Sequence, residues 1–140
     1  MSRIFWDTNL FIYLLEQKEE FSVLTKELRT RMLRRGDQLL TSAITLGEVL
    51  VKPTRVGDAE RCRKYERAIL SAATVIPFDI KAARYYASIK SSRSVQAPDA
   101  VQLSCAASVG VDLFITNDDR LQNKQVHGIQ FIVPLNRVPI

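Results

Sequence analysis

The sequence predicts a single α/β domain with three layers, in which helices cover both faces of a central, mainly parallel sheet of about five strands. Short apolar segments typical of buried strands alternate with longer segments of helical periodicity along the 140 residues. This length suits one domain, residues 1–140, and no linker, repeat or low-complexity tract divides the chain. Strands that alternate with helices favour parallel strands joined by helical crossovers.

The first elements are expected in the order strand, helix, helix, strand. Residues 3–6 (RIFW) and 38–41 (QLLT) are short apolar runs of the kind that form buried strands. A helix is predicted over residues 9–16, where leucines and a tyrosine recur at helical spacing. A second helix is predicted over residues 20–35, because its basic end and the following Gly36 are typical of a helix C-terminus.

The middle of the chain is expected to continue with two helices and a strand. Ser42 is a suitable N-cap for a helix through ITLGEVLV, and we expect Pro53 to end that helix. Asp58 is a suitable N-cap for a long helix that ends near Ala72. The apolar run TVIPF, residues 74–78, is the third predicted strand.

The last third of the chain is expected to hold two helices and two strands. Asp79 caps the helix predicted over residues 81–90 (KAARYYASIK). Pro98 lies near the start of the next helix, residues 99–108, and Gly110 follows its end. The final strands are expected over residues 112–116 (DLFIT) and 129–133 (IQFIV).

Composition narrows the class of function. The 20 Lys and Arg residues exceed the 15 Asp and Glu residues, so the net charge of +5 hints at a polyanionic partner such as nucleic acid. His127 is the single histidine, which excludes a histidine-rich zinc site. Cys62 and Cys105 are interpreted as reduced thiols, with a disulfide between them as the alternative. Asp7 interrupts the apolar stretch that a signal peptide would need, and no run is long enough to cross a bilayer, so we expect a soluble cytoplasmic protein.

Four carboxylates stand out because each follows or interrupts an apolar segment. Asp7 and Asp118 come at the ends of predicted strands, and Glu48 and Asp99 lie in the early turns of predicted helices. These strand ends and helix starts share one edge of a parallel sheet, where α/β folds bind ligands, so the four acids are expected to converge. A carboxylate in apolar surroundings is costly unless it is paired or holds a cation. Taken singly, each acid has an alternative interpretation as a helix cap, a turn residue or a solvated side chain.

An acidic pocket of this kind favours chemistry that depends on a divalent metal. Mg²⁺ prefers oxygen ligands, and a bound metal ion activates water and neutralises charge on phosphate oxygens. Such chemistry requires no histidine or serine nucleophile, which suits a chain with one histidine. The hydroxyls of Thr8, Ser42 and Thr116 lie beside these acids in the sequence and are candidates for orienting a carboxylate or water, with capping and turn formation as the alternative.

Four blocks in a fixed order resemble a known family. They are IFWDTNLFI from residue 4, TSAITLGEV from residue 41, APDAVQL from residue 97 and LFITND from residue 113. Together these blocks resemble the PIN domain, and the closest likeness is to the VapC-like ribonuclease toxins of type II toxin–antitoxin systems. The resemblance spans residues 3 to about 133.

The resemblance implies a fold, an activity and a site. It implies a Rossmann-like sheet and a nuclease that uses Mg²⁺ or Mn²⁺ to hydrolyse single-stranded or loop RNA. It also implies a homodimer, inhibited by a small antitoxin protein. The family's acids correspond to Asp7, Glu48, Asp99 and Asp118, and Asp7, Asp99 and Asp118 would hold the metal. Asn9 and Thr116 correspond to supporting positions, and Asp119 is the alternative to Asp118 as the fourth acid.

Basic residues on two predicted helices are candidates for contacts with RNA phosphates. These residues are Arg61, Arg63, Lys64, Arg84, Lys90 and Arg93. The alternative is that they form solvated helix faces. Two further functions remain open at this point: a catalytically silent module that only binds RNA, and a DNA nuclease of the same fold. A phosphotransfer protein is a weaker third reading, because the first strand ends in DTN and lacks a DxD motif.

Overall fold

The computed structural model describes residues 1–92 and 94–140, and over these residues it confirms the predicted fold class. A parallel sheet of five strands has the order β3-β2-β1-β4-β5. The strands are β1 Arg3–Trp6, β2 Gln38–Ser42, β3 Thr74–Ile76, β4 Val111–Ile115 and β5 Ile129–Val133. The helices are α1 Thr8–Leu15, α2 Glu19–Arg35, α3 Ala43–Arg55, α4 Ala59–Ala72, α5 Ile80–Lys90 and α6 Ala97–Val109, with 3-10 turns η1 Asp119–Leu121 and η2 Leu135–Arg137.

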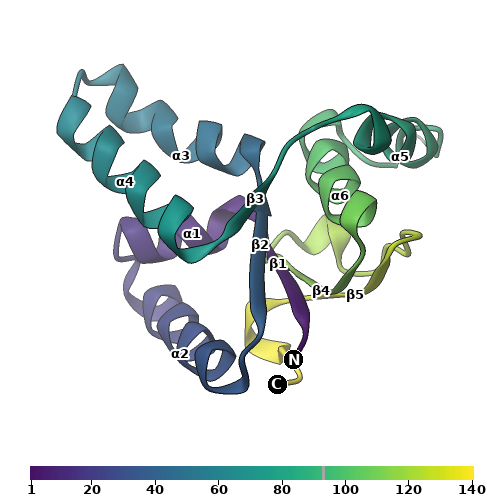
Figure 1. Cartoon of the computed structure of the whole chain (residues 1–140), viewed down its shortest axis with the longest axis horizontal. Coiled ribbons are helices and arrows are strands. Elements are labelled where there is room, and N and C mark those ends of the chain that lie inside the picture. Colours follow the sequence, from purple (N-terminus) through teal and green to yellow (C-terminus); the bar gives the residue numbers. More distant parts are fainter. Residues whose placement is uncertain (93) are drawn as a thin grey trace.

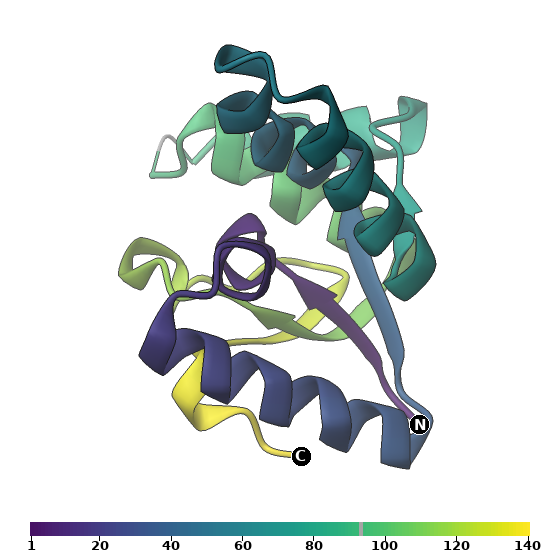
Figure 2. The same ribbon diagram turned by 90° about the vertical axis from the view of Figure 1, so that its left-hand side faces the viewer.

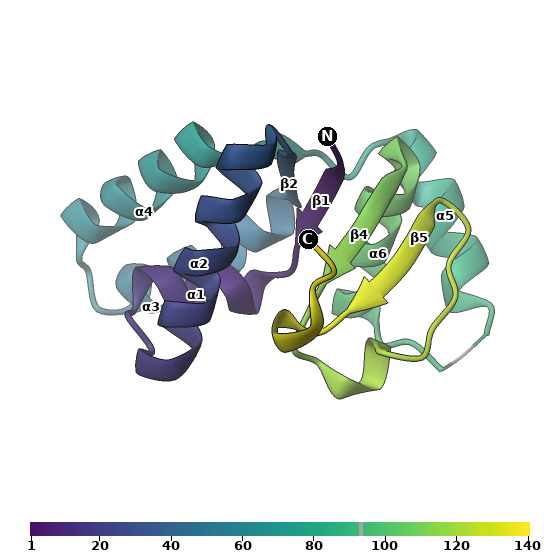
Figure 3. The same cartoon turned by 90° about the horizontal axis from the view of Figure 1, so that it is seen from below.

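The helices form a layer on each side of the sheet. Figure 1 shows α1 to α4 on one side of the strands and α5 and α6 on the other, and Figure 3 shows the same division from below. Figure 2 shows the long helix α2 beside the C-terminal segment. Each pair of helices connects two parallel strands, except that the short η1 segment lies between β4 and β5.

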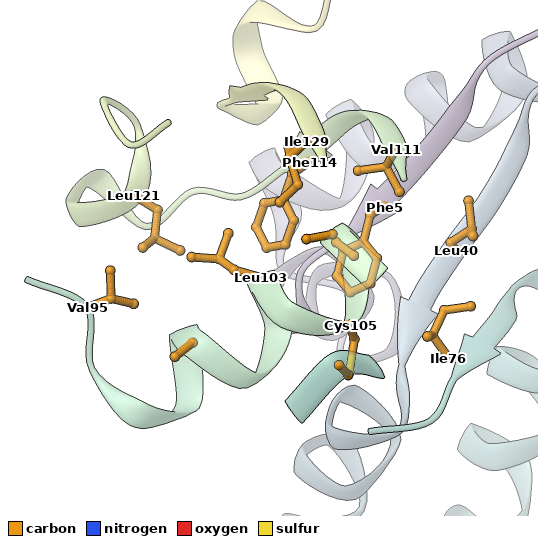
Figure 4. Packing of buried hydrophobic residues seen from close by; sticks show 14 residues of the cluster. Phe5, Leu40, Ile76, Val95, Leu103, Cys105, Val111, Phe114, Leu121 and Ile129 are labelled. Carbon is orange, nitrogen blue, oxygen red and sulfur yellow. The ribbon is translucent and has the colours of Figure 1, made fainter. Parts of the chain in front are cut away.

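The strands alternate their apolar side chains between two cores, as the pleat of a buried strand requires. In β1, Ile4 and Trp6 pack toward α1 to α4, whereas Phe5 packs toward α5 and α6. Phe5 and Phe114 stack with their ring centroids 5.0 Å apart. Figure 4 shows these two rings at the centre of the second core, with Leu103 of α6 beside them. The sheet is therefore fixed from both faces.

The helix boundaries follow the predicted caps. The carboxylate of Asp58 accepts a hydrogen bond from the amide of Arg61 at the start of α4, and Asp79 accepts one from Ala82 at the start of α5. Gly36 ends α2 in the left-handed region, with a φ of 74°, which a glycine adopts without steric cost. Caps of these types confirm the sequence predictions at these positions.

Two predicted boundaries are wrong. Helix α3 does not end at Pro53 but continues to Arg55, because a proline in the last turn removes only one backbone hydrogen bond. The helix ends just before Gly57, which has a φ of 72°. Strand β3 stops at Ile76 and does not include Pro77 and Phe78, because proline has no amide hydrogen to donate to a neighbouring strand.

The structure also tests the predictions about the two cysteines and about membrane-spanning segments. Cys62 and Cys105 are both free thiols, so the alternative of a disulfide between them is wrong. Burial raises the pKa of the Cys105 thiol to about 11, which makes it an inert core residue. Among the described helices, none is long and apolar enough to cross a membrane.

Candidate active site

Asp7 lies at the carboxyl end of β1, where it is held by donors from three parts of the chain. Its backbone amide donates to the carbonyl of Ile115, which continues the pairing of β1 with β4. Its carboxylate accepts hydrogen bonds from the amide of Thr8 at 2.8 Å, the hydroxyl of Thr116 at 2.7 Å and the side-chain amide of Gln102 at 3.1 Å. Asp7 is only 9% exposed, so this carboxylate is fixed in position.

Gln102 connects the elements that meet at this edge. Its Nε2 lies 3.1 Å from Asp7, 2.9 Å from the hydroxyl of Thr8 and 2.7 Å from the hydroxyl of Thr45. Two hydrogens are therefore shared among three acceptors. Its Oε1 accepts a hydrogen bond from the hydroxyl of Ser42 at the end of β2. Because Gln102 is 2% exposed, this network joins the end of β1, β2, α3 and α6 inside the protein.

Glu48 is held at the exposed side of the same network. The hydroxyl of Thr8 donates to its Oε1 at 2.6 Å and lies 3.1 Å from the hydroxyl of Thr45. The rest of the Glu48 side chain faces solvent. A continuous chain of hydrogen bonds therefore runs from buried Asp7 through Gln102 and Thr8 to an exposed carboxylate.

Asp99 and Asp118 face each other across one basic side chain. Asp99 is the third residue of α6, and Asp118 caps the η1 turn after β4. The Nη2 atom of Arg120 lies 2.6 Å from Asp118 and 3.4 Å from Asp99. The amide of Asp118 also donates to the hydroxyl of Thr116, which in turn bonds Asp7. These contacts bring Asp118 to the same edge as Asp7.

Burial and neighbouring charges shift the pKa values of three of the four acids. Burial raises the pKa of the Asp7 carboxyl, and the nearby charge of Glu48 raises it further against the opposing hydrogen bonds. Burial also raises the pKa of Asp99, with contributions from the charges of Asp118 and Asp7, although Arg120 opposes them. Hydrogen bonds from Arg120 hold the pKa of Asp118 below its usual value. The edge therefore carries mutual repulsion that a cation would relieve.

The supporting residues fall into two groups. Thr8 and Thr116 bind the acids directly, as described above, whereas Ser42 reaches them only through Gln102. The side-chain oxygen of Asn9 is buried and has no hydrogen-bond partner among the described residues. Asp119 is exposed within η1. Of the two neighbouring acids, Asp118 and not Asp119 shares Arg120 with Asp99.

The basic residues proposed for RNA are spread over two helices. Arg61 and Lys64 of α4 line a cavity of about 510 Å³ whose lining also includes acidic residues, among them Asp58. Arg61 lies 3.5 Å from the carboxylate of Asp58. Lys90 of α5 instead donates to the backbone carbonyl of Val95. The remaining positions are the exposed Arg63 and Arg84, and Arg93, which lies outside the described residues.

The carboxylate oxygens of the four acids are suitable ligands for a hard divalent cation, but the acids are not arranged around a common point. All the acids offer oxygen, which Mg²⁺ and Mn²⁺ prefer. Within residues 1–92 and 94–140, however, no three Asp, Glu, His or Cys side chains lie close enough together to form a ready metal site. Asp99 and Asp118 are instead paired with the guanidinium of Arg120. Asp7, Asp99 and Asp118 are the residues that would hold a metal, once Asp99 and Asp118 are released from Arg120.

Three residues of the site were missed in the sequence analysis. Thr45 and Gln102 each lie three positions from a predicted acid, Glu48 and Asp99, and so share its side of the helix. Each is a neutral polar side chain in a helix with apolar neighbours, and such a side chain gives a weaker signal than an isolated charge. Arg120 follows two acids in the run NDDR, and its pairing across to Asp99 in α6 is not visible in the sequence.

A parallel α/β fold that gathers carboxylates at the carboxyl edge of its central strands defines a class of domains with an acidic edge site. The sequence matches the PIN domain family over residues 4–126, and the chain belongs to this family. A search of curated protein sequences finds no significant match.

Solved structures share the fold over nearly the whole chain. A chain of the DNA-bound VapBC complex from Salmonella typhimurium matches with a TM-score of 0.74 and 23% identity, over 96% of this chain and 99% of that one. VapBC2 from Rickettsia felis, bound to a DNA fragment from its promoter, gives 0.72 and 18%, over 94% and 98%. VapBC-1 from nontypeable Haemophilus influenzae gives 0.65 and 17%, over 96% and 99%.

Proposed function

We propose that this PIN-domain protein is an endoribonuclease that depends on Mg²⁺ or Mn²⁺ and cleaves single-stranded or loop RNA. The observation that carries the proposal is the convergence of Asp7, Glu48, Asp99 and Asp118 at one edge, through hydrogen bonds and shared charge. Four acids from distant parts of the sequence repel one another, which is unfavourable for folding alone. Their arrangement is therefore best explained by a reaction that requires a cation.

Asp7, Asp99 and Asp118 are the metal ligands in this proposal. A divalent ion bound there supplies a Lewis acid, which lowers the pKa of water and neutralises charge on the reacting phosphate. The hydrogen bonds from Thr8, Thr116 and Gln102 keep the Asp7 carboxylate in one orientation, so little reorganisation is needed. A buried carboxylate oriented by three hydrogen-bond donors favours a metal-dependent nuclease over a silent RNA-binding module.

Glu48 has a different role in the proposal because it is the exposed member of the group. Its carboxylate is oriented by the hydroxyl of Thr8 and retains a second oxygen on the solvent side. There it accepts a proton from the water whose oxygen attacks phosphorus. The bond from phosphorus to one ester oxygen then breaks, and that oxygen leaves and takes a proton from solvent. Arg61 and Lys64, which are exposed on α4, hold phosphates of the RNA in this proposal.

We also propose that the protein is the toxin of a toxin–antitoxin pair and acts as a cytoplasmic homodimer. The support is the fold, which is shared with chains of VapBC complexes and of a toxin–antitoxin complex from Klebsiella pneumoniae. The partner in this proposal is a small antitoxin protein that covers the acidic edge.

The first experiment compares cleavage of single-stranded RNA, single-stranded DNA and folded tRNA in the presence of Mg²⁺, Mn²⁺ or EDTA. The Asp7→Asn variant removes one ligand charge but keeps the size of the side chain. It is expected to lower the cleavage rate by about 100-fold or more. Asp79→Asn is the matched control, because Asp79 caps α5 and asparagine caps a helix about equally well.

The outcomes separate the candidate functions. Metal-dependent cuts in RNA that disappear in Asp7→Asn and persist in Asp79→Asn support the proposal. Cuts in DNA alone would assign a DNA nuclease of the same fold. RNA binding without turnover under either metal would assign the silent binding module. Full activity in a folded Asp7→Asn protein would show that the site is wrongly placed.

A further inference from the structure

The acidic edge, which is formed by Asp7, Glu48, Asp99 and Asp118, already contains a cation. This cation is the guanidinium of Arg120. Its Nε donates to one carboxylate oxygen of Asp118 at 3.0 Å and its Nη2 donates to the other at 2.6 Å. The same Nη2 lies 3.4 Å from Asp99. Among the described residues, Arg120 is the basic side chain paired with each of these two acids. Both oxygens of Asp118 are therefore occupied by one guanidinium.

This arrangement competes with a divalent ion held by the same two acids. An ionised carboxylate has lone pairs for more than one partner, but a metal ion on these oxygens would lie close to the guanidinium, and the two cations would repel each other. Among the described residues, no three acids form a ready metal site while Arg120 is paired with Asp99 and Asp118. We therefore expect metal binding to displace Arg120 from at least one of these two acids.

Displacement of Arg120 from the two acids requires little free energy, so it can occur in the folded protein. The Arg120 side chain is 58% exposed, so its charge returns to water when the contacts open. Ion pairs at this exposure are weak compared with buried pairs. Asp118 would still cap η1, because the cap accepts its hydrogen bond from the backbone amide of Arg120 rather than from the side chain.

We propose that Arg120 is an internal counter-cation that competes with the divalent metal for Asp99 and Asp118 and so sets the metal concentration at which the site fills. The inference rests on the proposed metal-dependent function. In the metal-free protein, Arg120 partly neutralises the charges of the two acids. Its removal leaves their repulsion uncompensated, and the free energy of that repulsion then favours the metal.

The test measures the dissociation constant for Mn²⁺ by electron paramagnetic resonance of the free ion, with metal-free full-length protein. Arg120→Ala is expected to bind Mn²⁺ about three- to tenfold more tightly than the wild type. The reason is that no ion pair between Arg120 and the two acids has to open before the metal binds. Arg120→Lys keeps the charge but cannot span both acids, so its constant is expected to lie between the two. Arg34→Ala makes the same change in net charge on an exposed face of α2 and is expected to leave the constant unchanged.

A second readout follows the thermal unfolding midpoint without metal and with saturating Mn²⁺. The metal-induced rise in the midpoint is expected to be larger for Arg120→Ala than for the wild type. Equal or weaker Mn²⁺ binding by Arg120→Ala overturns the inference and leaves the proposed nuclease function standing. Absence of Mn²⁺ binding in the wild type and every variant overturns the inference together with the metal-dependent function.

Discussion

At the scale of a single residue, Asp7 shows that a side chain of the site can lower the stability of the folded protein. Its carboxylate accepts three hydrogen bonds, yet burial and the charge of Glu48 still raise its pKa. A raised carboxyl pKa means that the folded protein binds the proton more tightly than the unfolded chain does. The ionised form of Asp7 therefore costs stability at neutral pH.

Replacement of Asp7 by asparagine is expected to stabilise the metal-free protein by about 1 kcal/mol at neutral pH, because it removes a buried charge and keeps most hydrogen bonds. The advantage should shrink as the pH falls toward the raised pKa of Asp7, above its ordinary value of 3.8, since the wild-type carboxyl then takes up a proton. Urea unfolding in EDTA at several pH values measures this difference. A less stable variant at neutral pH would show that the hydrogen bonds to the carboxylate outweigh its burial.

The acids were predictable from the sequence, and the side chains that connect them were not. An isolated charge such as Asp7 or Asp99 in an apolar segment is costly, so it signals a use. Gln102 is neutral, and a neutral polar side chain in a helix gives no comparable signal. Its role depends on four hydroxyl and carboxylate partners that come together only in the folded chain.

At the scale of the elements, α6 is held against the loop before β5 by a glycine. Gly128 has a φ of 98°, and a Cβ there would lie 2.6 Å from the carbonyl oxygen of Ala107 in α6. Its own carbonyl accepts a hydrogen bond from Val111 at the start of β4. The close approach positions α6, and with it Asp99 and Gln102.

Replacement of Gly128 by alanine is expected to lower the free energy of unfolding by about 2–4 kcal/mol, because the new Cβ meets backbone atoms that cannot move aside. Gly57→Ala is the matched control, since Gly57 also has a positive φ, 72°, but a Cβ there meets nothing within 4 Å. Its expected cost is about 1 kcal/mol. Equal losses in urea unfolding of the two variants would mean that the contact with α6 contributes nothing.

Most element boundaries were predictable because caps and glycines are local signals. Asp58, Asp79 and Gly36 act through hydrogen bonds or dihedral angles within a few residues. The end of α3 was not predictable from Pro53, because a proline in the last turn is compatible with helix. The parallel order of the strands followed from their alternation with helices, but the sequence contains no comparable signal for which strands are neighbours.

At the scale of the whole molecule, the net charge of +5 is divided between faces with different expected roles. Arg61 and Lys64 lie beside the cavity next to α3, whereas Arg31 and Arg34 lie on exposed positions near the end of α2. The end of α2 leads into the start of β2, which is the edge of the sheet opposite to Asp7. Only the first pair is expected to contact RNA in the proposed function.

The double variant Arg61→Ala/Lys64→Ala is expected to weaken binding to single-stranded RNA and to reduce the slope of log K against log salt by about 1.4, since each of the two lost phosphate contacts contributes about 0.7. Fluorescence anisotropy in EDTA, where no cleavage is expected, measures the slope. Arg31→Ala/Arg34→Ala loses the same charge and is expected to keep the wild-type slope. Equal slopes for both double variants would show that the loss of net charge, and not the position of Arg61 and Lys64, causes the weaker binding.

The hydrogen bond between Thr116 and Asp7 joins residues that are 109 positions apart. Because β4 pairs directly with β1, the first strand stays without this neighbour until β4 has left the ribosome. Until then Asp7 lacks the donor Thr116, and Asp118 is not yet beside it. A nascent chain without β4 therefore contains no assembled site, and under the proposed function the cell that translates it is not exposed to an active nuclease during synthesis of residues 1–110.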